Sequence, residues 1–212
     1  MIVEIKMTFS PLLFLVAKKL SKVVIWNFRA DLRFRVVISQ ENGKLESKEA
    51  RGCYEMDAKL VTYVVESLIE KNISITAAES LTGGLFQSEI TSVPGSSGIF
   101  TGGFVTYSDD VKTQLLGVPA PLIQQYGVVS YEVAVAMAQG AQKTLHADLA
   151  VSFTGAAGPA GLEGETAGTA WIGISFQGQT DAYELYRPEL ARNDFREACC
   201  EFAFQKISDE LL

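Results

Sequence analysis

Short apolar segments alternate with amphipathic helical segments from residue 57 onward, and this alternation restricts the fold more than any other feature of the chain. Apolar residues recur at helical spacing from Asp57 to a stop at Lys71-Asn72. A short β-compatible run over 73–78 follows, and a second helix is expected over about 82–91. Strands that alternate with helices pack as layered, mostly parallel sheets.

The same alternation continues to the end of the chain. The remaining predicted elements are a strand over 102–108, helices from Ser108 to Leu116 and from Ser130, a strand over 148–155, a hairpin of strands over 169–176 and 180–186, and a last helix from Asn193. The predicted fold class is therefore α/β: a layered α/β/α sandwich with a mostly parallel sheet, formed by one domain over residues 56–212.

Residues 1–55 have a different composition and are expected to be a short N-terminal extension of unknown role. Residues 1–52 hold 10 Lys and Arg against 5 Asp and Glu, whereas residues 53–212 hold 8 against 20. Asn42-Gly43 suits a tight hairpin turn. No chemical motif is present in this segment, so a small accessory hairpin and a poorly ordered extension are the two interpretations.

Charge and hydropathy narrow the classes of partner. The formal net charge of -7 argues against a nucleic-acid-binding surface, which needs clustered basic residues, and favours a small-molecule substrate. The apolar run over 11–17 is too short to cross a bilayer, so no membrane span is expected. The three cysteines lack the pattern of a disulfide framework, which favours a reducing, cytoplasmic location. Adjacent Cys199 and Cys200 are expected to face the core and the surface of one helix.

The chain contains a single histidine, and this limits the possible mechanisms. His146 falls at the end of a predicted helix, where a capping role is expected rather than that of a base. One histidine and three scattered cysteines lack the ligand spacing of a metal site, and neither standard nucleotide-binding loop occurs, so no metal or other cofactor is expected. A serine nucleophile would then need a lysine, tyrosine or carboxylate base.

Hydroxyl side chains stand at the ends of three predicted strands: Ser80, Ser108 and Thr154. The carboxyl ends of strands border the ligand crevice of an open α/β sheet, so these residues are expected to converge. Lys112, one turn into the helix after Ser108, is within reach of that edge. A lysine acts as a base only if burial lowers its pKa well below about 10.4. The alternatives are helix capping for Ser80 and a solvated charge for Lys112.

The ordered blocks AAESLTGG, PGSSGIFTGGFVTYSDDVK, YGVVS and TGAAGP closely resemble the C-terminal domain of the CinA family, the nicotinamide-nucleotide amidases. The resemblance covers about residues 57–210. It implies hydrolysis of the carboxamide of nicotinamide mononucleotide to nicotinate mononucleotide and ammonia, without a metal, in pyridine-nucleotide salvage. Carried over by motif, Ser80 is the nucleophile, Lys112 the base, and Thr154 the third member of the triad; Lys112 is expected to take the Ser80 proton either directly or through Thr154.

The resemblance also implies a set of substrate-binding residues. The oxyanion is expected to bind backbone amides either near Thr82, Gly83 and Gly84 or in the loop with Gly155, Ala156 and Gly158, and these two alternatives stay open. Tyr107 is expected against the nicotinamide ring, with a core aromatic as the alternative. Arg192 and Arg196 are expected to bind the phosphate, because planar guanidinium groups suit it.

The sequence departs from the family at three places: Leu81 stands where many relatives have cysteine, Gly102 replaces an often basic residue, and the 160–167 loop is altered. Full-length CinA proteins also carry a large N-terminal molybdopterin-binding-like domain, for which residues 1–55 are too short. The alternatives to the amidase are therefore a non-catalytic partner protein linked to competence or DNA damage, and an amidase for another small amide. Relatives suggest a homo-oligomer.

Overall fold

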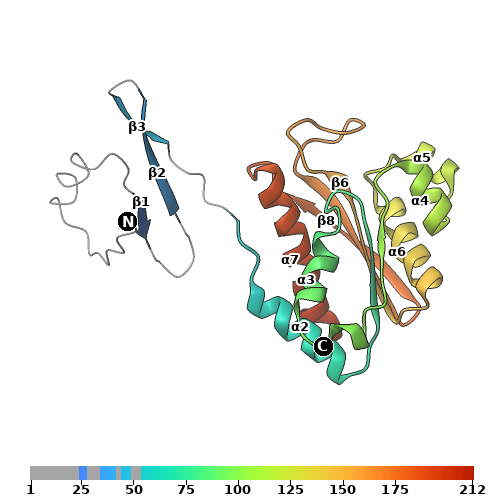
Figure 1. Ribbon diagram of the computed structural model, residues 1–212. Helices are drawn as coiled ribbons and strands as arrows, with labels where there is room; N and C mark the ends of the chain where they lie inside the picture. Colours follow the sequence, from blue (N-terminus) through green and yellow to red (C-terminus); the bar gives the residue numbers. More distant parts are fainter. Residues whose placement is uncertain (1–23, 28–33, 42–43, 49–53) are drawn as a thin grey trace. The chain divides into compact units, whose positions relative to one another are not determined.

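The computed structural model describes residues 24–27, 34–41, 44–48 and 54–212 (Figure 1). The chain divides into two compact units, with the boundary between Cys53 and Tyr54. The first unit contains an antiparallel sheet of β1 (Val24–Asn27), β2 (Phe34–Glu41) and β3 (Lys44–Lys48). Glu41 pairs with Lys44, so the strands that flank the predicted hairpin turn are neighbours. The turn residues Asn42-Gly43 themselves lie outside the described residues.

The second unit is built on a five-stranded sheet with the order β5-β4-β6-β7-β8. Its strands are β4 (Ile75–Glu79), β5 (Phe104–Val105), β6 (Leu149–Ala156), β7 (Thr169–Phe176) and β8 (Gln179–Tyr186). β4 is parallel to both β5 and β6, whereas β7 is antiparallel to β6 and to β8. Only β7 therefore runs against the other strands, which confirms the predicted mostly parallel sheet and its terminal hairpin.

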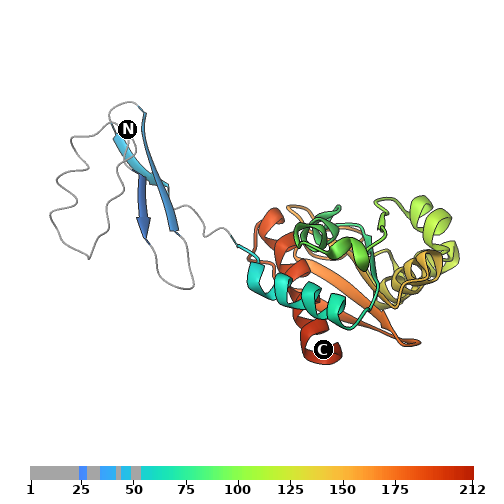
Figure 2. The same ribbon diagram turned by 60° about the horizontal axis from the view of Figure 1, so that its bottom comes forward.

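Helices cover both faces of this sheet (Figures 1 and 2). One face packs against α2 (Ala58–Glu70), α3 (Leu85–Ser92) and α7 (Arg192–Leu211). The other packs against α4 (Asp109–Leu116), α5 (Ala120–Tyr126) and α6 (Tyr131–Leu145). The predicted α/β/α layering is confirmed.

Strand alternation assigns the side chains of β6 to the two faces. Leu149, Val151 and Phe153 belong to the core under α2, α3 and α7. Ser152 lies on the other face and donates to the Ala134 carbonyl of α6 at 2.6 Å. Thr154 lies two residues after Ser152 and so points to the same face. The alternation of side chains along β6 therefore places its hydroxyl on the side of α4 and α6.

Several helix ends follow the sequence prediction because they depend on local hydrogen bonds. Ser108 and Ser130 cap α4 and α6 by accepting the amides of the residues three positions later. Gly117 ends α4 in the left-handed conformation. His146 caps the carboxyl end of α6 with φ of 53°, as expected for this position.

Two predicted element boundaries are wrong. The helix expected from about residue 82 begins at Leu85. Gly83 and Gly84 adopt φ of 60° and 94°, and such positive values are incompatible with a right-handed α-helix. The strand expected over 102–108 is reduced to Phe104–Val105. It is an edge strand, and Gly102 with φ of 152° takes the preceding backbone out of strand geometry.

Two further features were not predicted. No helix was predicted where α5 lies; its N-cap is Pro119 and its C-cap is Gly127. Cys199 and Cys200 are both fully buried, whereas one was expected at the surface. The reason is that α7 packs against the sheet, α2 and α3 together, so its apolar surface is wide.

None of the helices within 54–212 is long and apolar enough to cross a bilayer. The described residues also contain no group of three or more His, Cys, Asp and Glu side chains arranged to hold a metal ion.

Candidate active site

The candidate site begins at the carboxyl end of β4, where Glu79 and Ser80 point to opposite faces of the sheet. The Ser80 amide donates to the Phe153 carbonyl of β6 at 3.0 Å, so the strand geometry extends to Ser80. Ser80 therefore continues the face of Ala78, which packs on the α4 to α6 side, while Glu79 faces α3. This alternation separates a structural carboxylate from a hydroxyl that is available for chemistry.

Glu79 performs the capping role that the sequence analysis considered for Ser80. Its carboxylate is completely buried and accepts the amides of Gly84, Phe86 and Gln87 and the side-chain amide of Gln87, at 2.8 to 3.3 Å. A carboxylate is favourable at the positive end of a helix, and four donors replace its lost hydration. The capping interpretation of Ser80 is thus wrong, because the first turn of α3 is capped by Glu79.

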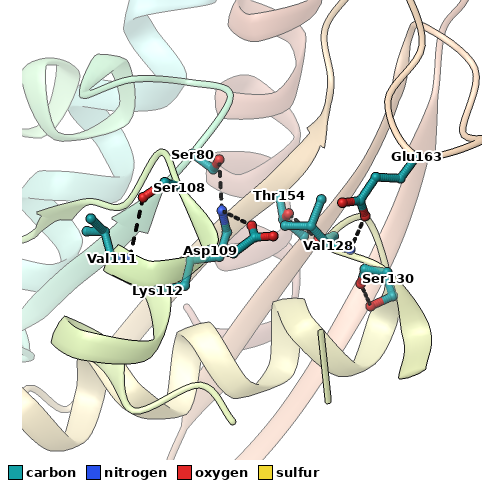
Figure 3. Close-up of polar contacts among 10 residues, drawn as sticks. Ser80, Ser108, Asp109, Val111, Lys112, Val128, Ser130, Thr154 and Glu163 are labelled. Atoms are coloured by element: carbon teal, nitrogen blue, oxygen red, sulfur yellow. Dashed lines mark hydrogen bonds and ion pairs between the residues drawn. The ribbon is translucent and has the colours of Figure 1, made fainter. Parts of the chain in front are cut away.

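Lys112 reaches Ser80 from the first turns of α4 (Figure 3). Its side chain is only 1% exposed, and Nζ lies 3.5 Å from Ser80 Oγ. Such a distance is long for a hydrogen bond, but catalytic pairs without substrate are often this long. The alternative interpretation of Lys112 as a solvated surface charge is wrong.

Burial lowers the pKa of Lys112 from its ordinary value, because a buried ammonium loses its hydration. Two carboxylates oppose this shift. Asp109 lies one turn away with Oδ1 at 3.8 Å from Nζ, and Glu163 acts through its charge. The desolvation effect is the larger one, so Lys112 gives up its proton more readily in this site than a lysine in water does.

Thr154 lies beside this pair at the end of β6 and is almost fully buried. Its hydroxyl donates to the Val128 carbonyl at 2.6 Å. Since a threonine hydroxyl has one proton, its oxygen can only accept a hydrogen bond from the cavity side. Thr154 is thus suited to orient a donor such as the lysine amine, rather than to pass a proton between Ser80 and Lys112.

The three predicted triad residues share one cavity of about 460 Å³. Tyr107 and Gly155 also line it, and Tyr107 is 66% exposed, so it is not a core aromatic. Ser108, the third hydroxyl expected at this edge of the sheet, lines it as well. The lining residues that were not predicted are Asp109, Asp110, Val128, Leu162 and Glu163. The cavity thus contains three carboxylates and a single basic side chain.

Glu163 is the most informative of the missed residues. It comes from the altered 160–167 loop, and its Oε2 accepts the Val128 amide at 2.8 Å. Its φ of 52° is uncommon for a residue with a side chain. No local pattern predicts the contact, because the two partners are 35 positions apart.

The two predicted arginines lie outside the lining of this cavity. Arg192 is exposed and bridges its rim: one nitrogen donates to the Gly158 carbonyl at 2.6 Å and another to the Tyr107 hydroxyl at 3.2 Å. Arg196 is half-buried and donates to the carbonyls of Leu81 and Thr82. The role of both arginines in phosphate binding remains a prediction.

The two glycine-rich segments, at Gly83-Gly84 and from Gly155 to Gly158, differ in whether their backbone amides are free to bind an oxyanion. The Gly84 amide is already bound to Glu79, and the Gly83 amide donates to the Ser80 carbonyl. Gly155 lines the cavity directly, whereas Ala156 and Gly158 do not. The amides of Gly83 and Gly84 are therefore unavailable in this arrangement, which removes part of one predicted alternative.

Of the remaining departures from the family pattern, neither Leu81 nor Gly102 is among the residues that line the cavity. Leu81 is buried in the core under α2, α3 and α7. Gly102 contributes its carbonyl, which accepts from the Thr76 hydroxyl at 2.9 Å. Only the altered loop, through Leu162 and Glu163, changes the lining of the site.

Comparison with known proteins gives a consistent result. The family described as the CinA C-terminal domain matches residues 57–211. A curated relative from Limosilactobacillus reuteri, named as a competence-damage inducible protein, is 46% identical over 157 residues, which are 73% of this chain and 38% of the relative. One from Lactiplantibacillus plantarum with the same name is 49% identical over 144 residues, 68% of this chain and 34% of the relative.

Solved structures agree with the sequence comparison. A CinA superfamily protein from Escherichia coli superposes with a TM-score of 0.69 at 30% identity, covering 71% of this chain and 88% of that one. A competence/damage inducible protein from Agrobacterium tumefaciens gives 0.68 at 30% identity, covering 71% and 93%. The chain spans less than two fifths of the length of these two curated relatives, but 88% and 93% of the two solved chains.

Proposed function

Because the chain belongs to the CinA C-terminal domain family, we propose that it is an amidohydrolase that converts nicotinamide mononucleotide to nicotinate mononucleotide and ammonia. The observation that carries the proposal is the buried Lys112 amine 3.5 Å from the Ser80 hydroxyl, inside a cavity that also contains Thr154. A serine and a desolvated lysine form a nucleophile and base without histidine.

The proposed reaction is acyl transfer through Ser80. Neutral Lys112 takes the Oγ proton as Oγ bonds to the carboxamide carbon. The resulting ammonium of Lys112 returns that proton to the leaving nitrogen as the carbon–nitrogen bond breaks, so ammonia departs and an ester to Ser80 remains. Water, deprotonated by Lys112, then attacks the ester carbon; the same proton passes from Lys112 to the departing Ser80 oxygen, and nicotinate mononucleotide and the free serine hydroxyl result.

Thr154 is proposed to orient the lysine. Its proton is held by the Val128 carbonyl, so its oxygen accepts an N–H of Lys112 and turns the nitrogen lone pair toward Ser80. This role differs from a proton relay, because the hydroxyl proton is already committed. It explains why a hydroxyl, rather than an apolar side chain, lies at this position near the carboxyl end of β6.

The rim of the cavity is proposed to bind the rest of the nucleotide. Tyr107 is exposed there and offers an aromatic surface to the pyridine ring. Arg192 lies next to the Tyr107 hydroxyl, and its guanidinium is exposed, so it is the proposed phosphate ligand. The carboxylates of Asp109, Asp110 and Glu163 suit the positive charge of the pyridinium ring.

The decisive experiment measures ammonia released from nicotinamide mononucleotide by the purified full chain. Ser80→Ala and Lys112→Met are expected to lower kcat by at least about 10³-fold. The matched controls are Ser88→Ala and Lys143→Met, which change exposed residues of the same types. Their turnover is expected to stay within about twofold of the parent.

Two results would contradict the proposal. Release of ammonia by the parent at the level of Ser80→Ala would leave the non-catalytic partner role suggested by the relatives' names. Turnover of simple amides with equal efficiency would replace the nucleotide substrate by another small amide. Mass spectrometry of a quenched reaction adds a direct readout, because the proposal expects an ester on Ser80 whose nicotinoyl group still carries the ribosyl phosphate.

A further inference from the structure

Arg196 was expected to bind phosphate, but its contacts lie at the turn that follows the nucleophile. Nε donates to the Leu81 carbonyl at 2.9 Å and Nη2 to the Thr82 carbonyl at 2.6 Å. Nη1 donates to the Asn193 side chain at 3.3 Å. All three guanidinium nitrogens are thus engaged by protein oxygens, and Arg196 does not line the cavity.

The charge of Arg196 has no counter-ion among the described residues, since it forms no ion pair with their carboxylates. The guanidinium is half-buried and lies close to the turn: a Cβ added to Gly83 would be 3.4 Å from Nη2. The buried Glu79 carboxylate, which accepts the Gly84 amide, lies at the same turn. The contribution of Arg196 to the site is therefore sought in how it orients the peptide groups of the turn, since oriented peptide dipoles can stabilise negative charge that develops on the reacting carboxamide.

The turn after Ser80 contains backbone amides that have no hydrogen-bond acceptor within the described residues. The amides that already have a protein acceptor are those of Ser80, Gly83, Gly84, Leu85, Phe86 and Gln87. Across the part of the chain that the structure describes, the Leu81 and Thr82 amides donate to no acceptor. The Thr82 hydroxyl is likewise buried without a partner. Buried polar groups are normally paired, so this cluster of free donors next to Ser80 is unusual.

Arg196 also fixes the direction of the Thr82 amide. The C=O and N–H of a trans peptide point in opposite directions. Arg196 belongs to α7 and holds the Leu81 carbonyl, so the Thr82 N–H of the same peptide points away from α7. Ser80 meets Lys112 on the other face of the sheet, where α4 packs. The orientation imposed by Arg196 thus turns a free amide toward the side of the nucleophile.

We propose that Arg196 is a positioning residue, which holds the Leu81 and Thr82 carbonyls so that the free amides of this turn stabilise the oxyanion, and that it is not a ligand of the substrate phosphate. The inference rests on the proposed amidase function. It assigns the two arginines of α7 to different tasks, with Arg192 at the rim and Arg196 behind the nucleophile.

Paired substrates separate these two tasks. Arg196→Gln is expected to lower kcat by about 10²-fold for both nicotinamide mononucleotide and its unphosphorylated riboside, with KM changed less than about twofold. Arg192→Gln is expected to raise KM for the mononucleotide alone. A rise in KM for the mononucleotide alone in Arg196→Gln, with unchanged kcat, would overturn the proposal.

Two further readouts exclude a general loss of folding. Added guanidinium ion at millimolar concentration is expected to restore part of the turnover of Arg196→Ala, which a merely destabilised protein would not show. Arg187→Gln, a change of an exposed arginine outside the site, serves as the matched control. Absence of rescue in an Arg196→Ala protein with parental Tm would count against the positioning role.

Labelling of Ser80 keeps the test independent of the substrate. Phenylmethylsulfonyl fluoride forms a sulfonyl ester with an activated serine and releases fluoride, and the product can be measured by mass spectrometry. Arg196→Gln is expected to slow this labelling at least tenfold, and Arg187→Gln is not. If the parent is labelled at Ser80 but hydrolyses neither the mononucleotide nor the riboside, the substrate assignment fails. The labelling rates then still test the positioning role of Arg196. Equal labelling rates in parent and Arg196→Gln would refute the role.

Discussion

The two faces of the central sheet use neighbouring residues of the same strands for opposite purposes. On β6, Phe153 is fully buried against Phe86, with ring centroids 5.1 Å apart, in the large apolar core under α2, α3 and α7. The next residue, Thr154, faces the cavity and the Val128 carbonyl. On β4, Glu79 and Ser80 divide in the same way. Alternation by one residue therefore separates the groups that stabilise the fold from those that form the site.

The difference also explains how a lysine can be buried here. The α6 face of the sheet carries small residues, including Ala78, Ala150 and Ser152, and Gly173 lies so close to α6 that a Cβ would be 2.6 Å from the Ala134 carbonyl. Small side chains bring α6 close and leave the end of this face for polar groups. The opposite face is filled by aromatic and aliphatic side chains, and its buried carboxylate, Glu79, accepts four hydrogen bonds.

Phe153→Ala gives the sharpest test of the comparison on the core face. Removing the ring leaves a cavity between β6, α3 and α7, so the free energy of unfolding is expected to fall by about 3–5 kcal/mol. Urea denaturation followed by circular dichroism measures this. The folded fraction is expected to keep parental reactivity at Ser80.

Thr154→Val is the matched change on the other face. It removes one hydrogen bond to Val128 and is expected to cost about 1 kcal/mol. Turnover is expected to fall at least tenfold because Lys112 loses its orienting partner. If Thr154→Val destabilised the chain as much as Phe153→Ala, the division between the two faces would not hold.

Glu79→Gln tests the carboxylate that caps α3. An amide group at this position turns one acceptor into a donor that faces other donors, so the free energy of unfolding is expected to fall by about 2 kcal/mol. Glu66→Gln, an exposed glutamate of α2, is the control and is expected to change it by less than about 0.5 kcal/mol. Equal stability of the two variants in urea would show that the cap contributes nothing.

Lys112→Met is expected to stabilise the chain while it removes activity. Burial lowers the pKa of Lys112 in the folded state, so the unfolded state binds more protons between the folded pKa and about 10.4, and stability rises with pH across that window. Below the folded pKa the cost of burying the ammonium is complete. The variant is therefore expected to gain on the order of 1 kcal/mol at neutral pH.

This gain should disappear as the pH rises above about 10.4, where both states of the parent hold a neutral amine. Thermal unfolding of the parent and of Lys112→Met at several pH values measures the difference. A constant Tm difference over that window would mean that desolvation of Lys112 is not its cause.

Asp109→Asn should give the smallest effect, a shift of the pH profile. Asp109 raises the pKa of Lys112, so its removal lowers that pKa further and the amine stays neutral at lower pH. The acidic limb of kcat/KM is expected to move to lower pH, by a modest amount because the Asp109 side chain is 49% exposed. Movement in the other direction would contradict the role of Lys112 as base.

Features that depend on neighbours in sequence could be predicted. Ser108, Gly117 and Ser130 end or begin helices through contacts within one turn, and these boundaries agree with the structure. The pattern of strands and helices was sufficient for the α/β/α layers. The start of α3 was missed because its cap, Glu79, lies in the preceding strand and the glycines after it form a turn.

The long-range contacts of the site were beyond such patterns. Glu163 meets Val128 across 35 positions, and Arg196 meets Thr82 across 114. The family resemblance supplied the predicted triad, and the structure brings its three members into one cavity. It did not supply the orientation of Thr154, whose proton is held by a carbonyl that only the folded chain brings near.

The sequence by itself determined the residue types available for chemistry: a single histidine, hydroxyls at three strand ends and a lysine one turn after a helix cap. The tertiary structure decided which of them meet, and how much water surrounds Lys112. The physical reason is that a helix or strand pattern arises from contacts within a few residues, whereas the desolvation that sets the pKa of an amine depends on every segment packed around it.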